Sequence, residues 1–209
     1  MKTLTFTAIL LLFSGMLYSQ VKAVTETGDE VVLYKDGRWA YVNAPPDGNR
    51  EIAVNETMFS KNAASTFLVK SNKVNIGVWI NPKDWIFSKG AENEDAEYSF
   101  QKRDDDLYAL LLTEKTPIPL ETLKDIALEN AKKVAADAMI TSEEYRNVNG
   151  LKILMLKMSA TIQGIRISYM GYYYSNANGT IQFLTYTGEN LAESFSPDIE
   201  NLLNGLAEL

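Results

Sequence analysis

The sequence LKILMLKM, residues 151–158, decides the fold of this chain. Successive side chains of a β-strand point to opposite faces, and here both faces are apolar, with Leu151, Ile153 and Met155 alternating with Leu154, Leu156 and Met158. A strand that is buried on both sides needs a covering layer above and below it. We therefore expect a sheet that lies between two layers.

Other strand-like segments surround this one. Residues 165–174 and 180–186 follow it after turn sequences at 163–164 and 176–179, and such short turns join antiparallel neighbours. Before it, the segments that we expect to be strands are 66–70, 74–80, 85–88, 97–102 and 107–113. The last two flank residues 103–106 and predict a hairpin.

Two amphipathic segments supply the covering layers. Apolar residues at positions 120, 123, 127, 131, 134 and 138 recur every three or four residues after Pro117 and Pro119, which predicts a long helix with one buried face. At the end of the chain, Ser196 and Pro197 are typical of an N-cap and a first helical position. An apolar stripe follows there, consisting of Ile199, Leu202, Leu203, Leu206 and Leu209. We expect these leucines to lie on the sheet, with contact to a partner as the alternative.

The N-terminal residues predict export. Lys2 precedes an apolar stretch at 4–17 that is too short and too interrupted to be a membrane anchor, so we read residues 1–19 as a signal peptide. We place cleavage after Ser19, with Ala23 as the alternative. The mature chain is expected to be secreted or periplasmic and to have no membrane span.

A small β-hairpin element is expected at 20–43, with strands at 22–25, 31–35 and 39–43. Asp36-Gly37 between apolar runs is a hairpin signal. Trp39 and Tyr41 share one strand face, where packing competes with ligand stacking. Residues 22–43 resemble a short element with the pattern DG-x-W-x-Y in exported proteins of Bacteroidetes-type bacteria.

Residues 44–64 read as a linker, since two prolines and Asp-Gly-Asn disrupt regular structure at its start. The main domain then covers 65–209. The expected fold class is α+β, with an antiparallel β-sheet covered by the long helix and the C-terminal helix as an α/β/α sandwich.

Composition limits the chemistry. The 209 residues include no cysteine and no histidine, so disulfides, thiol nucleophiles, Ser-His-Asp triads and thiolate or imidazole zinc sites are excluded. The formal net charge of −7 becomes −8 after removal of the signal peptide, which disfavours nucleic-acid binding. The sequence contains no phosphate-binding glycine motif, and we expect no cofactor.

The order of elements in residues 66–209 resembles the PsbP-like superfamily. The segments that carry the resemblance are 81–85 (NPKDW), 116–123, 149–150, 165–179 and 199–203. This superfamily is named for an extrinsic subunit of photosystem II and also contains a Ran-binding nuclear-import protein and exported bacterial proteins. The resemblance implies an antiparallel sheet between helices and a non-catalytic role in binding or assembling partners, and it implies no site residue.

Three sets of residues are candidates for function. The acidic runs 92–97 and 104–106 offer oxygen ligands for calcium but do not match a calcium-binding loop, so solvated turns are the simpler interpretation and we expect no metal. Glu143, Glu144 and Glu189 could supply the paired carboxylates of a glycosidase.

Tyrosines form the third set, an aromatic group to which Tyr186 also belongs. Tyr169, Tyr172, Tyr173 and Tyr174 lie on one strand, with Tyr169 and Tyr173 on one face and Tyr172 and Tyr174 on the other. Tyrosine suits both a half-buried core position and a recognition surface. We expect an exported, non-catalytic binding or assembly protein of the cell envelope with a protein partner, and a carboxylate-only polysaccharide hydrolase is the alternative.

Overall fold

The computed structural model describes residues 21–25, 30–33, 39–41, 52–90 and 95–209. The chain divides into two compact units, Met1–Glu51 and Ile52–Leu209. The first unit contains three short antiparallel strands in the order β1 (Val21–Val24), β2 (Glu30–Leu33) and β3 (Trp39–Tyr41). Several predicted features lie outside the described residues: the side chains of Trp39 and Tyr41, the turn at 36–38, the signal peptide, and residues 44–51 of the linker.

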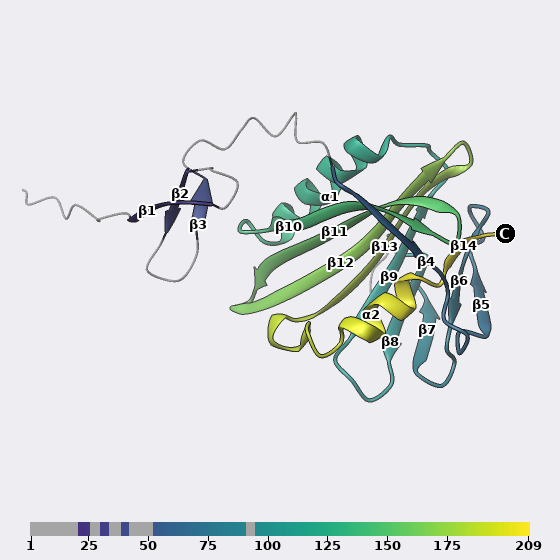
Figure 1. Ribbon diagram of the computed structural model, residues 1–209. Helices are drawn as coiled ribbons and strands as arrows, with labels where there is room; N and C mark the ends of the chain where they lie inside the picture. Colours follow the sequence, from purple (N-terminus) through teal and green to yellow (C-terminus); the bar gives the residue numbers. More distant parts are fainter. Residues whose placement is uncertain (1–20, 26–29, 34–38, 42–51, 91–94) are drawn as a thin grey trace, which may run out of the picture. The chain divides into compact units, whose positions relative to one another are not determined.

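The second unit is built on an eight-stranded sheet (Figure 1). Its strands, in spatial order, are β4 (Val54–Phe59), β10 (Met139–Val148), β11 (Leu151–Ile162), β12 (Ile165–Asn176), β13 (Gly179–Gly188), β9 (Tyr108–Glu114), β8 (Tyr98–Lys102) and β7 (Trp85–Lys89). All neighbours pair antiparallel except β4 and β10, which are parallel. The three consecutive strands from β11 to β13 and the hairpin of β8 and β9 were predicted from the sequence.

Strands β4 and β10 correct the sequence analysis. β4 lies within the predicted linker 44–64, and β10 occupies residues for which no strand was expected. Both are polar, and β4 lies at the sheet edge, where a strand has only one neighbour. The β4–β10 pairing is irregular, because Tyr145 lies opposite Val54 whereas Asn147 lies opposite Met58. β4 therefore uses four residues where β10 uses two.

One face of the sheet is covered by α1 (Leu120–Val134). The helix contacts β10, β11 and β12, and its buried Leu123 and Ala127 pack with Leu154, Leu156 and Tyr173. The predicted stripe is thus confirmed for its central residues, while Val134 at the end of the helix is 72% exposed.

The opposite face is covered by two elements. One is α2 (Ser196–Leu203), and the other is a three-stranded sheet in the order β14 (Leu206–Glu208), β6 (Ile76–Ile80) and β5 (Phe67–Lys70). Leu151, Ile153 and Met155 of β11 join this core cluster, so the two-sided burial of β11 is confirmed. The two predicted helices lie in the covering layers, but the second layer also contains a sheet that was not expected, formed by the segments predicted as strands at 66–70 and 74–80 together with β14. Figure 1 shows α1 and α2 on opposite sides of the large sheet.

The C-terminal helix is shorter than predicted. It ends at Leu203, and the chain turns at Asn204 and Gly205. Gly205 passes so close to β6 that a Cβ atom at this position would collide with the carbonyl oxygen of Trp79. Leu206 therefore lies in β14, and Leu209 is 45% exposed. Ser196 is the first helical residue instead of the N-cap, which is Phe195.

Candidate binding surface

The four predicted tyrosines do not form one exposed surface. Tyr172 and Tyr173 are both fully buried, on opposite faces of β12, and Tyr169 and Tyr174 are partly exposed. The predicted alternation of faces is confirmed, because Tyr172 and Tyr174 lie in the cluster that contains α2 whereas Tyr173 packs against α1. Tyr172 and Tyr173 therefore occupy core positions, one of the two expected roles, because α2 and α1 cover them.

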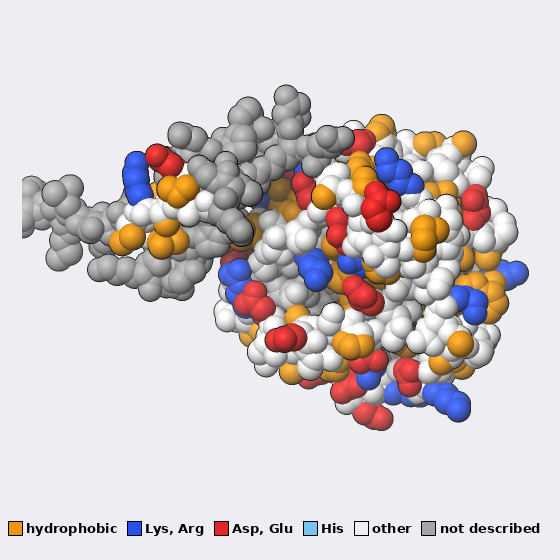
Figure 2. Space-filling view, viewed as in Figure 1, with side chains coloured by type: hydrophobic (Ala, Val, Ile, Leu, Met, Phe, Trp, Pro, Cys, Tyr) orange, Lys and Arg blue, Asp and Glu red, His pale blue; other side chains and the backbone are white. Residues whose placement is uncertain are grey.

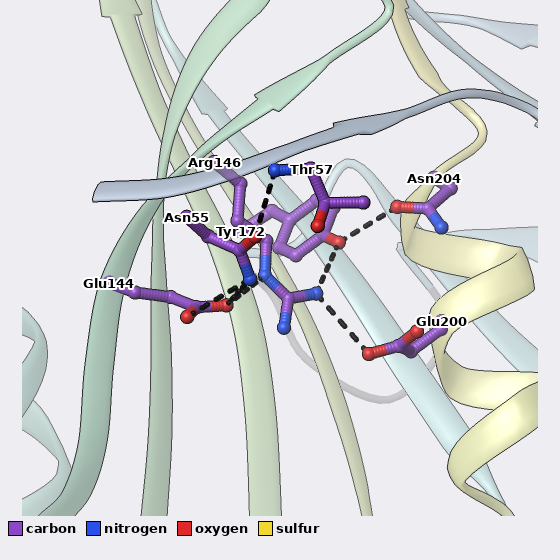
Figure 3. Close-up of polar contacts among 7 residues, drawn as sticks. All are labelled: Asn55, Thr57, Glu144, Arg146, Tyr172, Glu200 and Asn204. Atoms are coloured by element: carbon purple, nitrogen blue, oxygen red, sulfur yellow. Dashed lines mark hydrogen bonds and ion pairs between the residues drawn. The ribbon is translucent and has the colours of Figure 1, made fainter. Parts of the chain in front are cut away.

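Tyr172 belongs to a buried polar cluster around Arg146 (Figure 3). Nη1 of Arg146 donates to the Tyr172 hydroxyl at 3.0 Å and lies 3.3 Å from Oε1 of Glu200, and Nε donates to Glu144. The guanidinium also lies 4.5 Å from the ring centroid of Phe59. Burial raises the pKa of Tyr172 to about 12, although the Arg146 charge opposes this rise.

This cluster joins elements that are distant in sequence. The Tyr172 hydroxyl donates to Oδ1 of Asn204 at 2.8 Å, and Nδ2 of Asn55 donates to Glu144. The partners therefore come from β4, β10, β12 and the C-terminal end of α2 (Figure 3). A buried arginine with two carboxylates and a hydroxyl around it needs these partners to offset desolvation. The Arg146 cluster thus fixes the edge strand and α2 to the sheet.

The three candidate glutamates are paired separately. Glu143 forms an ion pair with Lys124 at 2.8 Å, Glu144 with Arg146, and Glu189 with Arg166 at 3.0 Å. Glu143 and Glu144 are also consecutive residues of a strand, so their side chains lie on opposite faces of the sheet. No two of these carboxylates face a shared cleft in the part of the chain that the structure describes.

Carboxylates of the two acidic runs also form hydrogen bonds and ion pairs within the described residues. The buried carboxylate of Glu97 accepts hydrogen bonds from the hydroxyls of Ser71 and Thr113 and from the backbone N–H of Asn72. Asp105 pairs with Lys102 at 2.9 Å, and residues 91–94 lie outside the described residues. Figure 2 shows acidic side chains at the lower edge of the main unit, over the loop between β8 and β9 that contains 104–106.

An apolar surface lies on the face of the sheet that carries α1. This helix is 15 residues long and about 10 Å wide, and strands are spaced about 4.8 Å apart. It can therefore cover only two or three of the eight strands, and its main contacts are with β10, β11 and β12. The part of this face formed by β13, β9, β8 and β7 extends beyond the helix.

We call this part, together with the adjoining Tyr169, the open face, and define it by Ile86, Tyr108, Leu110, Tyr169 and Tyr186. Ile86 is 42% exposed, and the other four are partly exposed. Tyr108, Tyr186 and Tyr169 are directly paired across β9, β13 and β12. Their rings form a row, with centroids 5.4 Å apart and stacked for the first pair and 6.1 Å apart for the second.

Only Tyr169 of the predicted site residues belongs to the open face. Tyr186 was recognised as part of the aromatic group, whereas Ile86, Tyr108 and Leu110 were not. A usable signal was present in β9, where Tyr108 and Leu110 alternate with buried Ala109 and Leu111. This strand is apolar on both faces like β11, and a single long helix is too narrow to cover both strands.

Comparison with known proteins supports a PsbP-like fold. No protein-family model matches the sequence, and no curated protein does. The solution structure of cyanobacterial PsbP (CyanoP) from Synechocystis sp. PCC 6803 is similar, with a TM-score of 0.55 and 15% identity over 71% of this chain and 95% of that chain. At such low identity this similarity shows the fold alone.

Two weaker similarities accompany it. LpqN of Mycobacterium tuberculosis, described as involved in cell envelope biogenesis, has a TM-score of 0.48 at 10% identity and covers 68% of this chain and 88% of that chain. A Pseudomonas aeruginosa protein of unknown function, a putative regulator, has a TM-score of 0.45 at 11% identity and covers 68% of this chain and 96% of that chain. Within the described residues, none of the helices has the length and apolar character needed to cross a bilayer.

Proposed function

We propose that this chain is an exported, non-catalytic binding or assembly protein of the cell envelope, and that it binds a protein partner through the open face. The observation that carries the proposal is the row of Tyr108, Tyr186 and Tyr169 on a sheet face that extends beyond its covering helix. Tyrosine is enriched at protein interfaces because its ring is apolar and its hydroxyl remains able to form hydrogen bonds.

Composition supports a role without turnover. The chain lacks histidine and cysteine, and each of the three candidate glutamates is already paired with a cation. The rival, a carboxylate-only polysaccharide hydrolase, requires an acid and a base across a common cleft. Hydrolysis of a defined polysaccharide by the purified protein, lost in Glu144→Gln or Glu189→Gln, would support the rival.

Export is supported by the predicted signal peptide at 1–19. Mass spectrometry of the protein recovered from the producing cells should give a mature N-terminus at Gln20. Recovery of the intact N-terminus from the cytoplasm would contradict this part of the proposal.

Site-specific photo-crosslinking tests the binding role. A benzophenone side chain placed at position 186 should capture a partner in the native envelope, and a second probe at 108 should capture the same one. The matched control is position 132, an exposed residue of α1. Equal capture from all three positions would show nonspecific contact, and no capture from 186 or 108 would overturn the assignment of the open face.

A further inference from the structure

A small cavity lies in the open face at the edge of the large sheet. Its volume is about 110 Å³, and it adjoins β7, β8 and the stacked pair Tyr108 and Tyr186. The lining residues are Ile86, Phe87, Ser88, Ser99, Phe100, Gln101, Tyr108 and Tyr186. Tyr108 and Tyr186 contribute rings on this face, whereas the rings of Phe87 and Phe100 lie on the opposite face of the sheet. No lining residue is charged, so the cavity suits a neutral apolar group.

One polar atom beside the cavity has no partner in the described part of the fold. The hydroxyl oxygen of Ser99 is buried and has no hydrogen-bond partner among the described residues. A buried hydroxyl without a partner costs free energy. A ligand group with one donor or acceptor would remove that cost, and the Gln101 amide lines the same cavity.

The cavity also adjoins a strand edge. β7 is the last strand of the sheet, and its Ile86 and Phe87 are 42% and 40% exposed. An edge strand presents backbone donors and acceptors on one side, and an extended segment can pair with them while its alternate side chains enter adjoining pockets. A ligand on a partner chain can thus be held by backbone pairing as well as by the cavity.

We propose that this cavity binds the phenol ring of a tyrosine on an extended partner segment that pairs with β7. At about 110 Å³ the cavity is smaller than the apolar cavity of roughly 150 Å³ that holds benzene, so it admits part of one ring and no larger group. The rings of Tyr108 and Tyr186 favour edge or stacked contacts with a third ring, and the Ser99 hydroxyl pairs with the phenol oxygen. This inference rests on the proposed function and names the chemistry of the group that the open face anchors.

Peptide binding provides the test. The probes are three end-blocked hexapeptides of alternating threonine and valine that carry tyrosine, phenylalanine or alanine at one central position, together with free p-cresol. Wild-type protein should bind the tyrosine peptide about two- to tenfold more tightly than the phenylalanine peptide, which is the range of one net hydrogen bond. The alanine peptide should bind most weakly, because it leaves the cavity unfilled.

Two variants separate the contribution of the Ser99 hydroxyl to binding from the contribution of the cavity volume. Ser99→Ala should bind the tyrosine and phenylalanine peptides equally, and it should remain folded because the Ser99 hydroxyl has no partner to lose. Ser99→Leu should fill the cavity and abolish the difference between the tyrosine and alanine peptides, with the thermal midpoint measured alongside. Ser142→Ala, an exposed serine of β10, is the matched control and should behave as wild type.

Several results would overturn the inference. Equal affinity of wild type for the three peptides would show that the cavity does not recognise the phenol group. A preference for the tyrosine peptide that persists in Ser99→Ala would show the same. Binding of p-cresol without binding of any peptide would assign the cavity to a small molecule instead. If these peptide results fail while crosslinking from position 186 still captures a partner, the proposed function stands and only the cavity assignment falls.

Discussion

Tyr172 and Tyr173 are consecutive residues of β12, both fully buried, yet their hydroxyl groups have opposite surroundings. The Tyr172 hydroxyl accepts from Arg146 and donates to Asn204, whereas the Tyr173 hydroxyl has no hydrogen-bond partner among the described residues. Burial raises the pKa of both phenols. Tyr172 therefore connects elements of the fold, whereas Tyr173 buries an unpaired polar atom, which lowers the free energy of unfolding.

Substitution by phenylalanine should affect the two tyrosines in opposite directions. Tyr173→Phe removes an unpaired buried hydroxyl and should raise the free energy of unfolding by about 1 kcal/mol. Tyr172→Phe should lower it by about 1–3 kcal/mol, because a donor of Arg146 and the Asn204 oxygen lose their partner. Denaturant unfolding of both variants measures the difference, and a loss of stability in Tyr173→Phe would show that its hydroxyl has a partner.

Leu203→Ala should strongly destabilise the isolated protein. Leu203 is the last residue of α2, and its side chain is fully buried in the core. Truncation of such a side chain to alanine costs about 2–5 kcal/mol. The control is Val134→Ala, at a 72% exposed position of α1, which should change the thermal midpoint little. An unchanged midpoint in Leu203→Ala, with weaker partner binding, would instead make α2 an interface.

Stability should fall in acid through Glu97. Burial opposes ionisation of Glu97, but hydrogen bonds from Asn72, Ser71 and Thr113 outweigh burial and lower the pKa of this carboxyl below its ordinary value of 4.5. A lowered pKa in the folded state stabilises the fold above the unfolded-state pKa, and this contribution is lost as the pH falls through the folded-state pKa. The unfolding free energy of wild type should therefore decrease below about pH 4.5.

Glu97→Gln isolates this contribution. The variant should be less stable than wild type at pH 7 and should show a smaller loss between pH 5 and pH 3, measured by urea unfolding at each pH. Parallel pH curves for the two proteins would show that other carboxylates cause the acid sensitivity. Glu193→Gln, at an exposed position, is a suitable control because it keeps the Glu97 contacts intact.

Residues 52–209 should fold without the first unit. Among the described residues, every member of the three core clusters and every side chain packed against them lies at or after Ile52. A chain that begins at Ile52 should therefore unfold cooperatively with nearly the thermal midpoint of the mature protein. Limited proteolysis of the mature protein should cut within 44–50 and leave this fragment intact, and unfolding after the cut would show that the first unit completes the core.

Local sequence patterns were sufficient to predict much of the secondary structure and strand order of the main unit. The period of two in 151–158 predicted burial on both faces, and turn sequences at 163–164 and 176–179 predicted the antiparallel order of β11, β12 and β13. These signals operate between neighbours in the chain. β4 was missed because its pairing with β10 is parallel and joins residues about 90 positions apart, and because its polar sequence is typical of both edges and linkers.

The binding surface was harder to predict for a different reason. Alternation assigned Tyr172 and Tyr173 to opposite faces correctly, but it cannot tell which part of a face another element covers. That depends on the width of α1 and on where β5, β6 and α2 lie. The sequence therefore identified tyrosines as important residues of the sheet, whereas the open face emerged only from the position of the helix.

The irregular pairing of β4 has a consequence for assembly. Because four residues of β4 match two of β10, this edge lacks the even ladder that a further strand needs. Among the described strands of the large sheet, β7 is therefore the edge that suits a further strand. Two copies that joined their β7 edges would be related by a two-fold axis and would use up both regular edges, so the assembly would close as a dimer. A sheet with two regular edges could continue into a fibre, and the register shift in β4 disfavours such growth at its edge of the large sheet.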